Sequence, residues 1–409
     1  MTKVGAQPLP GDPCHNSRGF RPERSSRAMK RCLATVGLGL VLVWTVLSRP
    51  AYSHNPTTTT VLFNREIATL LQRKCVQCHA DGKLAMPLIT FGQTRPWAEA
   101  IKEETLSRRM PPWPAERGFG AYANDIGLTP REFEFLISWI DGGVPEGTDP
   151  APAFVDHGDH WTLGVPDLVA SPAAGSAVEA RSAPTFKRVT IDTGLAREEW
   201  IRGIDFKPDA RVTRAAFFSI DGGGQYLGGW TPWQSSTELP AGAAFKLPAR
   251  ARVAVDIMYS GAAQSVTDKP QLALYFASGS PPAPVTATTV RAMADAKTPA
   301  RFVAEFKATD ARALVSMRPE LPAGTRSFEI KLMRPDGSRD VLLWVKDADQ
   351  LWPTPYVFKK PVPLPAGSVL QAVAYVESGA DLVAPPKPRI GEGRSGPQFT
   401  LTLNHYATK

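Results

Sequence analysis

Two cysteines and a histidine in the run Cys75-Val76-Gln77-Cys78-His79 have the residue types and the spacing that attach a haem group. In this pattern each thiol is joined to a vinyl group of the haem, and the imidazole binds the iron from one side. A zinc site would need four ligands, usually from two such pairs, and the sequence has no second pair. A redox dithiol normally lacks the adjacent histidine. The run therefore predicts one covalently bound haem c, held by Cys75, Cys78 and His79.

The second axial ligand of the iron is expected from the segment after His79, where Met86 and Met110 are the candidates. Met110 comes directly before the run Pro111-Pro112-Trp113-Pro114, whose stiff backbone would hold a thioether in place. Met86 lies close to His79 in the chain, and a methionine there more often packs than binds iron. We therefore predict His79 and Met110 as the iron ligands. Such a pair leaves no open position, which suits electron transfer rather than oxygen chemistry.

Three helices are expected to position these ligands in a small α domain, residues 54–148, of the class I-like cytochrome c type. Asn64 predicts an N-cap for a helix that runs from about Arg65 into the haem motif. A second helix is predicted from Pro96 to about Arg108. Thr129-Pro130 has the residues of a helix start, and Gly142-Gly143 has those of a helix end.

Residues 1–53 predict an N-terminal extension and a Sec-type signal peptide with cleavage near Ser53. The apolar run over residues 33–47 is about 15 residues long, shorter than the roughly 20 that span a membrane, so no stable membrane span is expected after signal removal. The start stays open between Met1 and Met29. A periplasmic or secreted location is expected, which agrees with thioether formation outside the cytoplasm.

The charge of the chain lies mostly in this N-terminal segment. Its eight basic and two acidic residues account for +6 of the formal net charge of +8, so the remainder carries about +2. That balance gives no argument for binding nucleic acid. Basic residues near the haem motif could instead steer an acidic redox partner protein. These residues are Arg73, Lys74, Lys83, Arg108 and Arg109.

Residues 149–189 are expected to form a linker, because proline, alanine and small residues dominate both of its ends. His157 and His160 lie within it and remain alternative iron ligands if the linker folds back. Beyond the linker, short apolar and β-branched runs alternate with glycine and proline turns. This pattern predicts two β-sandwich or jelly-roll domains, residues 190–285 and 298–409. The expected fold class is therefore multidomain, α followed by all-β.

Residues 61–148 resemble the cytochrome c domain found in exported bacterial proteins. In that family the domain is fused to a copper type II, ascorbate-dependent monooxygenase-like module of the peptidylglycine monooxygenase type. The resemblance implies a haem domain joined to a copper-binding β module. The residues that carry it, besides the haem motif, are Val61-Leu62-Phe63-Asn64, Thr94-Arg95-Pro96-Trp97, Arg109-Met110-Pro111-Pro112-Trp113, Leu128-Thr129-Pro130 and Ser138-Trp139-Ile140-Asp141-Gly142-Gly143.

The β half resembles the copper module more weakly and departs from it at the copper ligands. Copper of this type is held by neutral imidazoles, with one methionine in the second site. Where the family has paired histidines this chain has Arg214 and Ala215, and Met258 stands where the family has a histidine before a tyrosine. In the second β domain the histidine positions are Met317 and Pro319. The resemblance therefore implies the scaffold without its copper chemistry.

A count of histidines leads to the same expectation. From residue 161 onward the sequence holds one histidine, His405, and one imidazole cannot build two copper sites. A soft copper(I) site from Met258, Met317 and Met333 stays open, although packing is the commoner role of methionine. The aromatic stretches at residues 230–233 and 351–353 could line a ligand groove. Copper is not expected as a cofactor.

Three functions follow from these patterns. The first is an exported electron carrier with one haem, whose β module serves docking or binding rather than catalysis. The second is an enzyme, a copper monooxygenase that receives electrons from its own haem, against which the missing histidines argue. The third is a haem-based sensor that binds a ligand with its β half.

Overall fold

The computed structural model of the 409-residue chain describes residues 59–155, 160–222, 224–279, 282–294, 300–322, 324–376 and 399–408. The expected signal peptide, its cleavage site and His157 lie outside the described residues. The chain divides by its internal contacts into Met1–Asn55 and Pro56–Lys409, and every described residue belongs to the second unit. None of the helices in the described part is long and apolar enough to cross a membrane.

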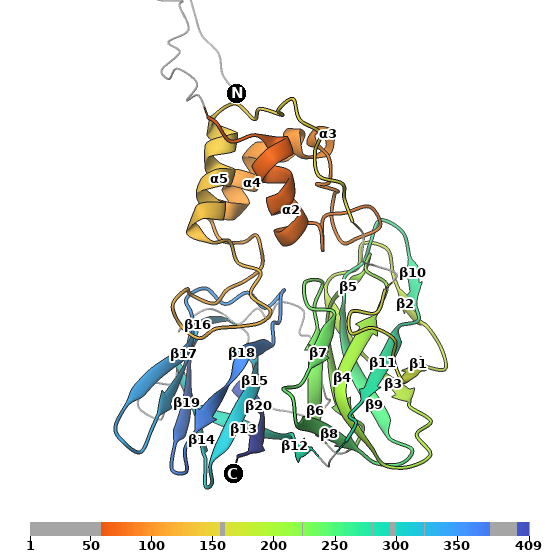
Figure 1. The fold of residues 1–409 in the computed structure, drawn as a ribbon, viewed down its shortest axis with the longest axis vertical. Helices are drawn as coiled ribbons and strands as arrows, with labels where there is room; N and C mark the ends of the chain where they lie inside the picture. Colours follow the sequence, from red (N-terminus) through yellow and green to blue (C-terminus); the bar gives the residue numbers. More distant parts are fainter. Residues whose placement is uncertain are drawn as a thin grey trace, which may run out of the picture. The chain divides into compact units, whose positions relative to one another are not determined.

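Short helical segments lie within residues 63–141, separated by loops at residues 75–90 and 107–129 (Figure 1). Phe63, Ile67 and Leu71 from the first helices pack against Leu136 and Trp139 of the last one, and this cluster is fully buried. The ring centroids of Phe63 and Trp139 are 5.9 Å apart. The segments are η1 (Phe63–Ile67), α2 (Ala68–Lys74), α3 (Phe91–Thr94), η2 (Arg95–Trp97), α4 (Ala98–Leu106) and α5 (Pro130–Asp141).

The start of α5 confirms the prediction made from Thr129-Pro130. The Thr129 side chain accepts a hydrogen bond from Glu132 N, and the Glu132 carboxylate accepts one from Thr129 N. Pro130 is the first helical residue, where a missing N–H costs nothing. The predicted Asn64 cap is wrong. Leu62 precedes the first helical turn, and the Asn64 amide donates instead to the Gly147 carbonyl oxygen at 3.3 Å.

The helix that leads to Met110 begins later than predicted. Thr90 caps the short α3, a 3-10 turn follows at Arg95–Trp97, and the regular helix α4 occupies Ala98–Leu106. Pro96 fits the 3-10 turn. A single helix running from α3 through α4 would lose one backbone hydrogen bond at this residue, because proline has no N–H.

The first β region is a sandwich of two sheets around a buried apolar core (Figure 1). In the described residues one sheet of the sandwich has the order β1-β11-β4-β8-β12 with β7 beside β4, and the other has the order β3-β9-β5-β6. Strands β2 and β10 form a separate two-stranded sheet. Alternate residues of β9, such as Val253, Val255 and Ile257, point into the core. The strands are β1 (Leu168–Ala170), β2 (Ser176–Val178), β3 (Thr185–Asp192), β4 (Glu199–Lys207), β5 (Thr213–Ile220), β6 (Tyr226–Trp230), β7 (Ser236–Glu238), β8 (Ala243–Leu247), β9 (Arg252–Tyr259), β10 (Val266–Asp268), β11 (Gln271–Phe276) and β12 (Ala283–Pro284).

The second β region is built from one eight-stranded sheet of order β17-β16-β19-β14-β13-β20-β15-β18 among the described strands. Strand β13 pairs with β20 over Thr286–Ala292 and with β14 at Met293, so it joins the two halves of the sheet. Residues of both halves, Ile330 and Leu401 among them, share a second buried core. The strands are β13 (Thr286–Ala294), β14 (Arg301–Lys307), β15 (Arg312–Glu320), β16 (Thr325–Met333), β17 (Arg339–Val345), β18 (Tyr356–Leu364), β19 (Val369–Val376) and β20 (Phe399–Ala407).

The predicted β-rich character of the C-terminal half is confirmed, but strands begin earlier than the expected boundaries. Strands β1 and β2 and the start of β3 lie within the expected linker 149–189, where β1 pairs with β11 and β2 with β10. Strand β13 begins at Thr286, before the expected start at 298. Three-residue strands that pair with distant segments leave little local pattern, which is why the composition did not reveal them.

Candidate haem site

The haem motif follows directly from the end of α2. Cys75 is the C-cap residue of this helix and its N–H donates to the Leu71 carbonyl oxygen. The Cys75 carbonyl oxygen then accepts from Cys78 N at 3.1 Å and from His79 N at 2.9 Å. These bonds fold the motif into a tight turn. The turn holds the two thiols and the imidazole on a short stretch of ordered backbone.

The two thiols are unpaired and partly exposed. Burial and, to a smaller extent, the neighbouring Cys78 raise the pKa of Cys75 to about 12. Burial also raises the pKa of Cys78 to about 12. Both groups are therefore neutral thiols at physiological pH, unlike the thiolates of reactive cysteines. Cys75 packs against the buried core of the helical region.

The His79 ring is oriented by the loop that follows it. Its Nδ1 lies 3.1 Å from the Met86 carbonyl oxygen, so Nδ1 carries the proton and donates. Nε2 makes no hydrogen bond to a described residue. Burial lowers the pKa of His79, which keeps the imidazole neutral. A neutral imidazole with Nδ1–H bound to a carbonyl and Nε2 open is the arrangement of a metal ligand.

The same contact separates the roles of the two candidate methionines. The Met86 backbone lies on the Nδ1 side of the His79 ring, away from Nε2, because its carbonyl oxygen accepts the Nδ1 proton. Ala85 N donates to the Cys78 carbonyl oxygen and Leu88 N to that of His79, so this loop closes on the motif itself. A second iron ligand would have to approach from the side away from this loop, which favours Met110 over Met86 as the candidate.

Met110 lies where the chain leaves α4. Its N–H donates to the Glu104 carbonyl oxygen at 3.2 Å, and the Arg109 guanidinium forms two hydrogen bonds of 2.8 Å with the Glu104 carboxylate. The Met110 side chain is half-buried. The last turn of the helix therefore fixes the backbone from which the thioether projects.

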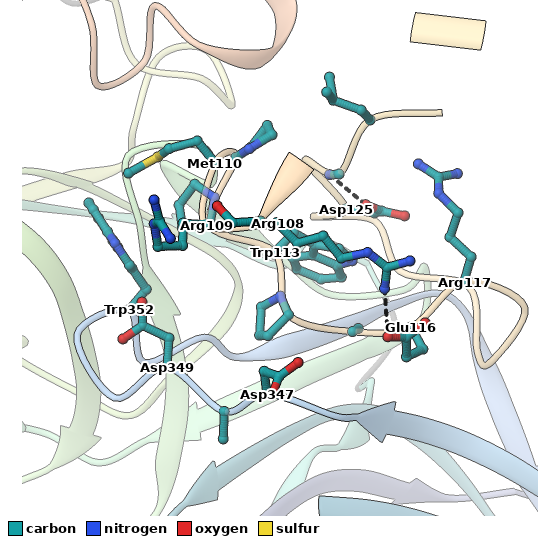
Figure 2. Close-up of a pocket in the computed structure, with 18 of the residues that line it drawn as sticks. Arg108, Arg109, Met110, Trp113, Glu116, Arg117, Asp125, Asp347, Asp349 and Trp352 are labelled. Atoms are coloured by element: carbon teal, nitrogen blue, oxygen red, sulfur yellow. Dashed lines mark hydrogen bonds and ion pairs between the residues drawn. The ribbon is translucent and has the colours of Figure 1, made fainter. Parts of the chain in front are cut away.

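Met110 lines a cavity of about 840 Å³ together with Trp113, Leu128, Phe133 and Trp352. In Figure 2 Met110 and Trp352 are drawn toward one end of this cavity, and the ion pair of Arg108 and Glu116 toward the other. A volume of this size lies within the range of cofactor sites. Cys75, Cys78 and His79 are not among the residues that line it. The structure thus places Met110 at a cavity without bringing it into contact with the motif.

Ion pairs connect the motif to the start of α5. The Lys74 ammonium donates to the Gly127 carbonyl oxygen at 2.9 Å and lies 3.8 Å from the Glu132 carboxylate. Arg73 also pairs with Glu132, at 3.0 Å. Burial raises the pKa of Glu132, but the hydrogen bonds from Thr129 and the two basic residues outweigh it, so the pKa is lowered. Glu132 in the first turn of α5 is therefore connected by ion pairs to the end of α2.

The basic residues expected to steer a partner are largely neutralised within the protein. Arg73 and Lys74 share Glu132, Arg108 pairs with Glu116 at 2.7 Å, and Arg109 pairs with Glu104 at 2.8 Å. Electrostatic steering by these side chains is weaker than their number suggests, because each nearby carboxylate cancels part of the field.

Three of the positions that replace the copper ligands of the resembled family, Ala215, Met258 and Met317, are filled by apolar packing. Ala215 and Met258 are cross-strand neighbours and are buried with Phe217 and Tyr226. Met317 is buried in the separate core of the second β region, and Met333 ends β16. The three methionines considered for a soft copper site thus lie in different surroundings. The described residues contain no group of three or more histidine, cysteine or acidic side chains arranged to hold a metal ion.

His405 and His160 differ in their surroundings, because His405 is buried and His160 is exposed. His405 lies in β20 and is 1% exposed. Its Nδ1 accepts a hydrogen bond from Arg312 at 3.0 Å, and its Nε2 is 2.9 Å from Thr288 Oγ1. Both ring nitrogens are therefore engaged. His160 is exposed and lies before the first β region.

An anchor loop, Trp113–Asn124, was not anticipated from the sequence. It leaves the Met110 turn and pairs with the second β region, where Glu116 N donates to the Trp344 carbonyl oxygen and Ala123 N to that of Val357, both at 2.7 Å. The Tyr122 side chain is 4% exposed and belongs to the core of the second β region. The alternation of proline, glycine and aromatic residues here gives no strand signal, so only the aromatic content hinted at burial.

Arg214 is a second residue whose surroundings the sequence did not reveal. Its guanidinium carbon lies 4.7 Å from the centroid of the Trp352 ring, and that ring is 5.9 Å from the Trp233 ring. Trp352 also lines the cavity at Met110, so Arg214 of the first β region lies beside a residue of that cavity.

No protein-family profile and no curated protein matches the chain. Among solved structures, the chain is similar to the major capsid protein P2 from Bacteriophage PM2, with 8% identity and a TM-score of 0.27 over 58% of this chain and 96% of that chain. The tandem CBM22 domain of Paenibacillus barcinonensis Xyn10C is 9% identical, with a TM-score of 0.15 over 62% and 96%. Bacillus subtilis oxalate decarboxylase is 9% identical, with a TM-score of 0.14 over 64% and 86%. Likenesses this weak carry no argument.

Proposed function

We propose that the protein is an exported electron carrier, a cytochrome c with one covalent haem and a β half that serves docking or binding. The observation that carries this proposal is the orientation of His79, whose Nδ1 donates to the Met86 carbonyl oxygen and leaves Nε2 open beside two neutral thiols. The residues present fit a haem. Two accessible thiols and one open imidazole nitrogen on a single turn are the groups that covalent attachment requires.

Each residue has a separate part in this proposal. Cys75 and Cys78 would hold the group through thioethers, and His79 would be one axial ligand. Met110 would be the second, because it lines a cavity of suitable volume and has an ordered backbone. When bound, the haem supplies an iron that alternates between the ferric and ferrous states by exchange of one electron with a redox partner protein. His79 and Met110 would be the two groups of the protein that hold the iron.

The β half is proposed to lack copper chemistry. The support for this is the buried apolar packing of Ala215 and Met258, where the resembled family binds copper, together with the engagement of both ring nitrogens of His405. An apolar cluster of this kind offers no nitrogen ligand for copper.

The test is metal analysis and absorption spectroscopy of protein matured in a host that attaches haem. Wild type is compared with Met110→Ala and with the matched control Met86→Ala. We expect one covalent haem per chain and no copper in all three. The methionine–iron band of the oxidised spectrum should be absent in Met110→Ala and present in Met86→Ala, because Met86 contributes its carbonyl oxygen rather than its sulfur.

Three results would contradict the proposal. Wild type without covalent haem would remove its basis, and loss of the band in Met86→Ala alone would exchange the two methionines. One or two tightly bound copper ions per chain would favour the monooxygenase instead.

A further inference from the structure

The chain passes from the first β region to the second without an exposed linker. Strand β12 pairs with β8 of the first region, and β13 begins at Thr286 in the second. Val285, the residue between these strands, is 3% exposed and belongs to the core of the first region. Its N–H donates to the Ala244 carbonyl oxygen at 2.9 Å. Independent domains are usually joined by exposed segments that few contacts cross, whereas this crossing point is buried.

Side chains of the second β region also pack against the first. Val315 of β15 is buried within the core of the first region. Phe217 and Tyr226 lie on the other face of the β3-β9-β5-β6 sheet, in a separate buried cluster against which Ala287 of β13 packs. The Ala287 N–H donates to Gln225 Oε1 at 3.0 Å. The two regions are therefore joined by apolar packing on both faces of this sheet and by a hydrogen bond.

Arg318 of β15 crosses the same contact with a charged group. Its guanidinium carbon lies 3.9 Å from the centroid of the Phe217 ring and 5.4 Å from that of Tyr226. Its Nη2 pairs with Glu320 at 2.7 Å, and the other oxygen of this carboxylate accepts a hydrogen bond from Thr400. The Arg318 side chain is 11% exposed. A cation over an aromatic face is attracted by the ring, and more strongly where water is excluded.

We propose that the two β regions fold and unfold as a single cooperative body, and that Arg318 is the residue that pins them together. The sheet face that carries Phe217 and Tyr226 is then a joint within the chain rather than a surface for a ligand or a partner protein. The inference goes beyond the proposed function and does not depend on the haem, because each contact that carries it lies within the β half.

Hydrogen exchange of the mature full-chain protein, measured by mass spectrometry in rising urea, tests this proposal. Peptides from β9 report on the first region and peptides from β16 on the second, because each strand is paired on both sides in its sheet. We expect wild type to lose protection in both peptides at the same urea concentration. Arg318→Met keeps an unbranched apolar side chain and removes the charge. In this variant both peptides should lose protection at lower urea, and at concentrations that differ from each other.

Lys331→Met is the matched control. Lys331 also pairs with a glutamate two positions away in its own strand, Glu329 at 2.6 Å, and its side chain is 39% exposed. We expect both peptides of this variant to lose protection together at the wild-type concentration. If Arg318→Met does not fold, Arg318→Lys replaces it. A smaller downward shift is expected there, because lysine keeps the charge without the planar group that stacks on a ring.

A double-mutant cycle tests whether the contact with Phe217 is the one that matters. Phe217→Leu removes the ring beneath Arg318 and should itself lower the urea midpoint. The variant with both changes should lower the midpoint by less than the sum of the two single shifts, because the contact can be lost only once.

The outcomes separate this inference from the proposed function. Loss of protection at different urea concentrations in β9 and β16 of wild type would show two independent domains and overturn the inference. An Arg318→Met variant that behaves as Lys331→Met does, or single shifts that add fully in the double variant, would remove Arg318 as the pin. The covalent haem content is measured separately, so it decides the proposed function and leaves these outcomes unchanged.

Discussion

The His405 side chain illustrates how burial and a neighbouring cation fix the protonation of one residue. Burial and, to a smaller extent, the charge of Arg312 lower the pKa of His405 to about 4, whereas Asp310 acts in the opposite direction. The neutral ring is required by the observed contacts, because Nδ1 accepts a hydrogen bond from Arg312. A histidine in this state is a structural residue rather than a pH sensor near neutrality.

This lowered pKa predicts how stability depends on pH. Below about pH 6.5 the unfolded chain protonates His405 while the folded chain does not, so the free energy of unfolding falls as the pH falls from 6.5 to about 4. At about 1.4 kcal/mol for each pKa unit, the loss is on the order of 3 kcal/mol. Urea unfolding of wild type and His405→Gln across this range checks it. Equal slopes for the two proteins would show that His405 does not contribute.

Residue patterns revealed the parts of the candidate site that are local in sequence. Cys75, Cys78 and His79 are recognisable because a single turn has to present all three. The preference for Met110 over Met86 came from the stiffness of the following prolines, and the contact of His79 Nδ1 with the Met86 carbonyl oxygen supports it. Arg214 was noticed only as a departure from a copper ligand. Its contact with Trp352 joins segments that lie far apart in the chain, which no spacing reveals.

At the scale of elements, the N-terminal cap of α5 also contacts the segment that carries the proposed haem ligands. Thr129 and Glu132 exchange hydrogen bonds across the first turn, and the same Glu132 carboxylate pairs with Arg73 and Lys74 at the end of α2. The negative charge also lies at the helix N-terminus, where the helix dipole favours it. The Glu132 carboxylate thus completes the N-terminal cap of α5 and also holds the end of α2, which leads into the motif, through ion pairs.

Replacement of the cap therefore has a defined cost. Thr129→Ala should lower the free energy of unfolding of the helical region by about 1 kcal/mol, because an N-cap side chain is lost. Thr129→Ser is the matched control, since it keeps the hydroxyl that accepts from Glu132 N. The measurement is urea unfolding monitored by haem absorbance. A loss in Thr129→Ser as large as that in Thr129→Ala would show that the methyl group, and not the cap, matters.

Helices and strands could be predicted where neighbouring residues determine their ends. They were missed where a partner far away in the sequence determines them. Thr129-Pro130 predicted α5 because the cap and the proline act within one turn. Asn64 has the residue type of a cap, but its amide is taken by the Gly147 carbonyl oxygen, and the first N–H groups of the helix donate to residues 145 and 146. Strand β1 consists of three residues and exists only because β11 pairs with it.

At the scale of the whole unit, the anchor loop Trp113–Asn124 joins the proposed iron ligand to the second β region. It begins three residues after Met110 and ends at Asn124, whose amide donates to the Pro355 carbonyl oxygen at 2.6 Å. The Tyr122 ring packs against Tyr356 and Phe358 at 5.3 and 5.2 Å between centroids. The segment that carries the ligand is therefore stabilised by a core far from the haem motif in sequence.

Weakening this loop should weaken the proposed binding of the iron by Met110. Tyr122→Ala removes a buried ring and should lower the free energy of unfolding by about 3–5 kcal/mol. Tyr122→Phe is the matched control, because it keeps the ring and loses only the hydrogen bond to the Leu342 carbonyl oxygen, worth about 1 kcal/mol. In urea, the methionine–iron band of Tyr122→Ala should disappear at a lower denaturant concentration than that of wild type, together with the fluorescence change of the β half. A band that persists to the wild-type concentration while the β half unfolds early would show that Met110 is held by α4 alone.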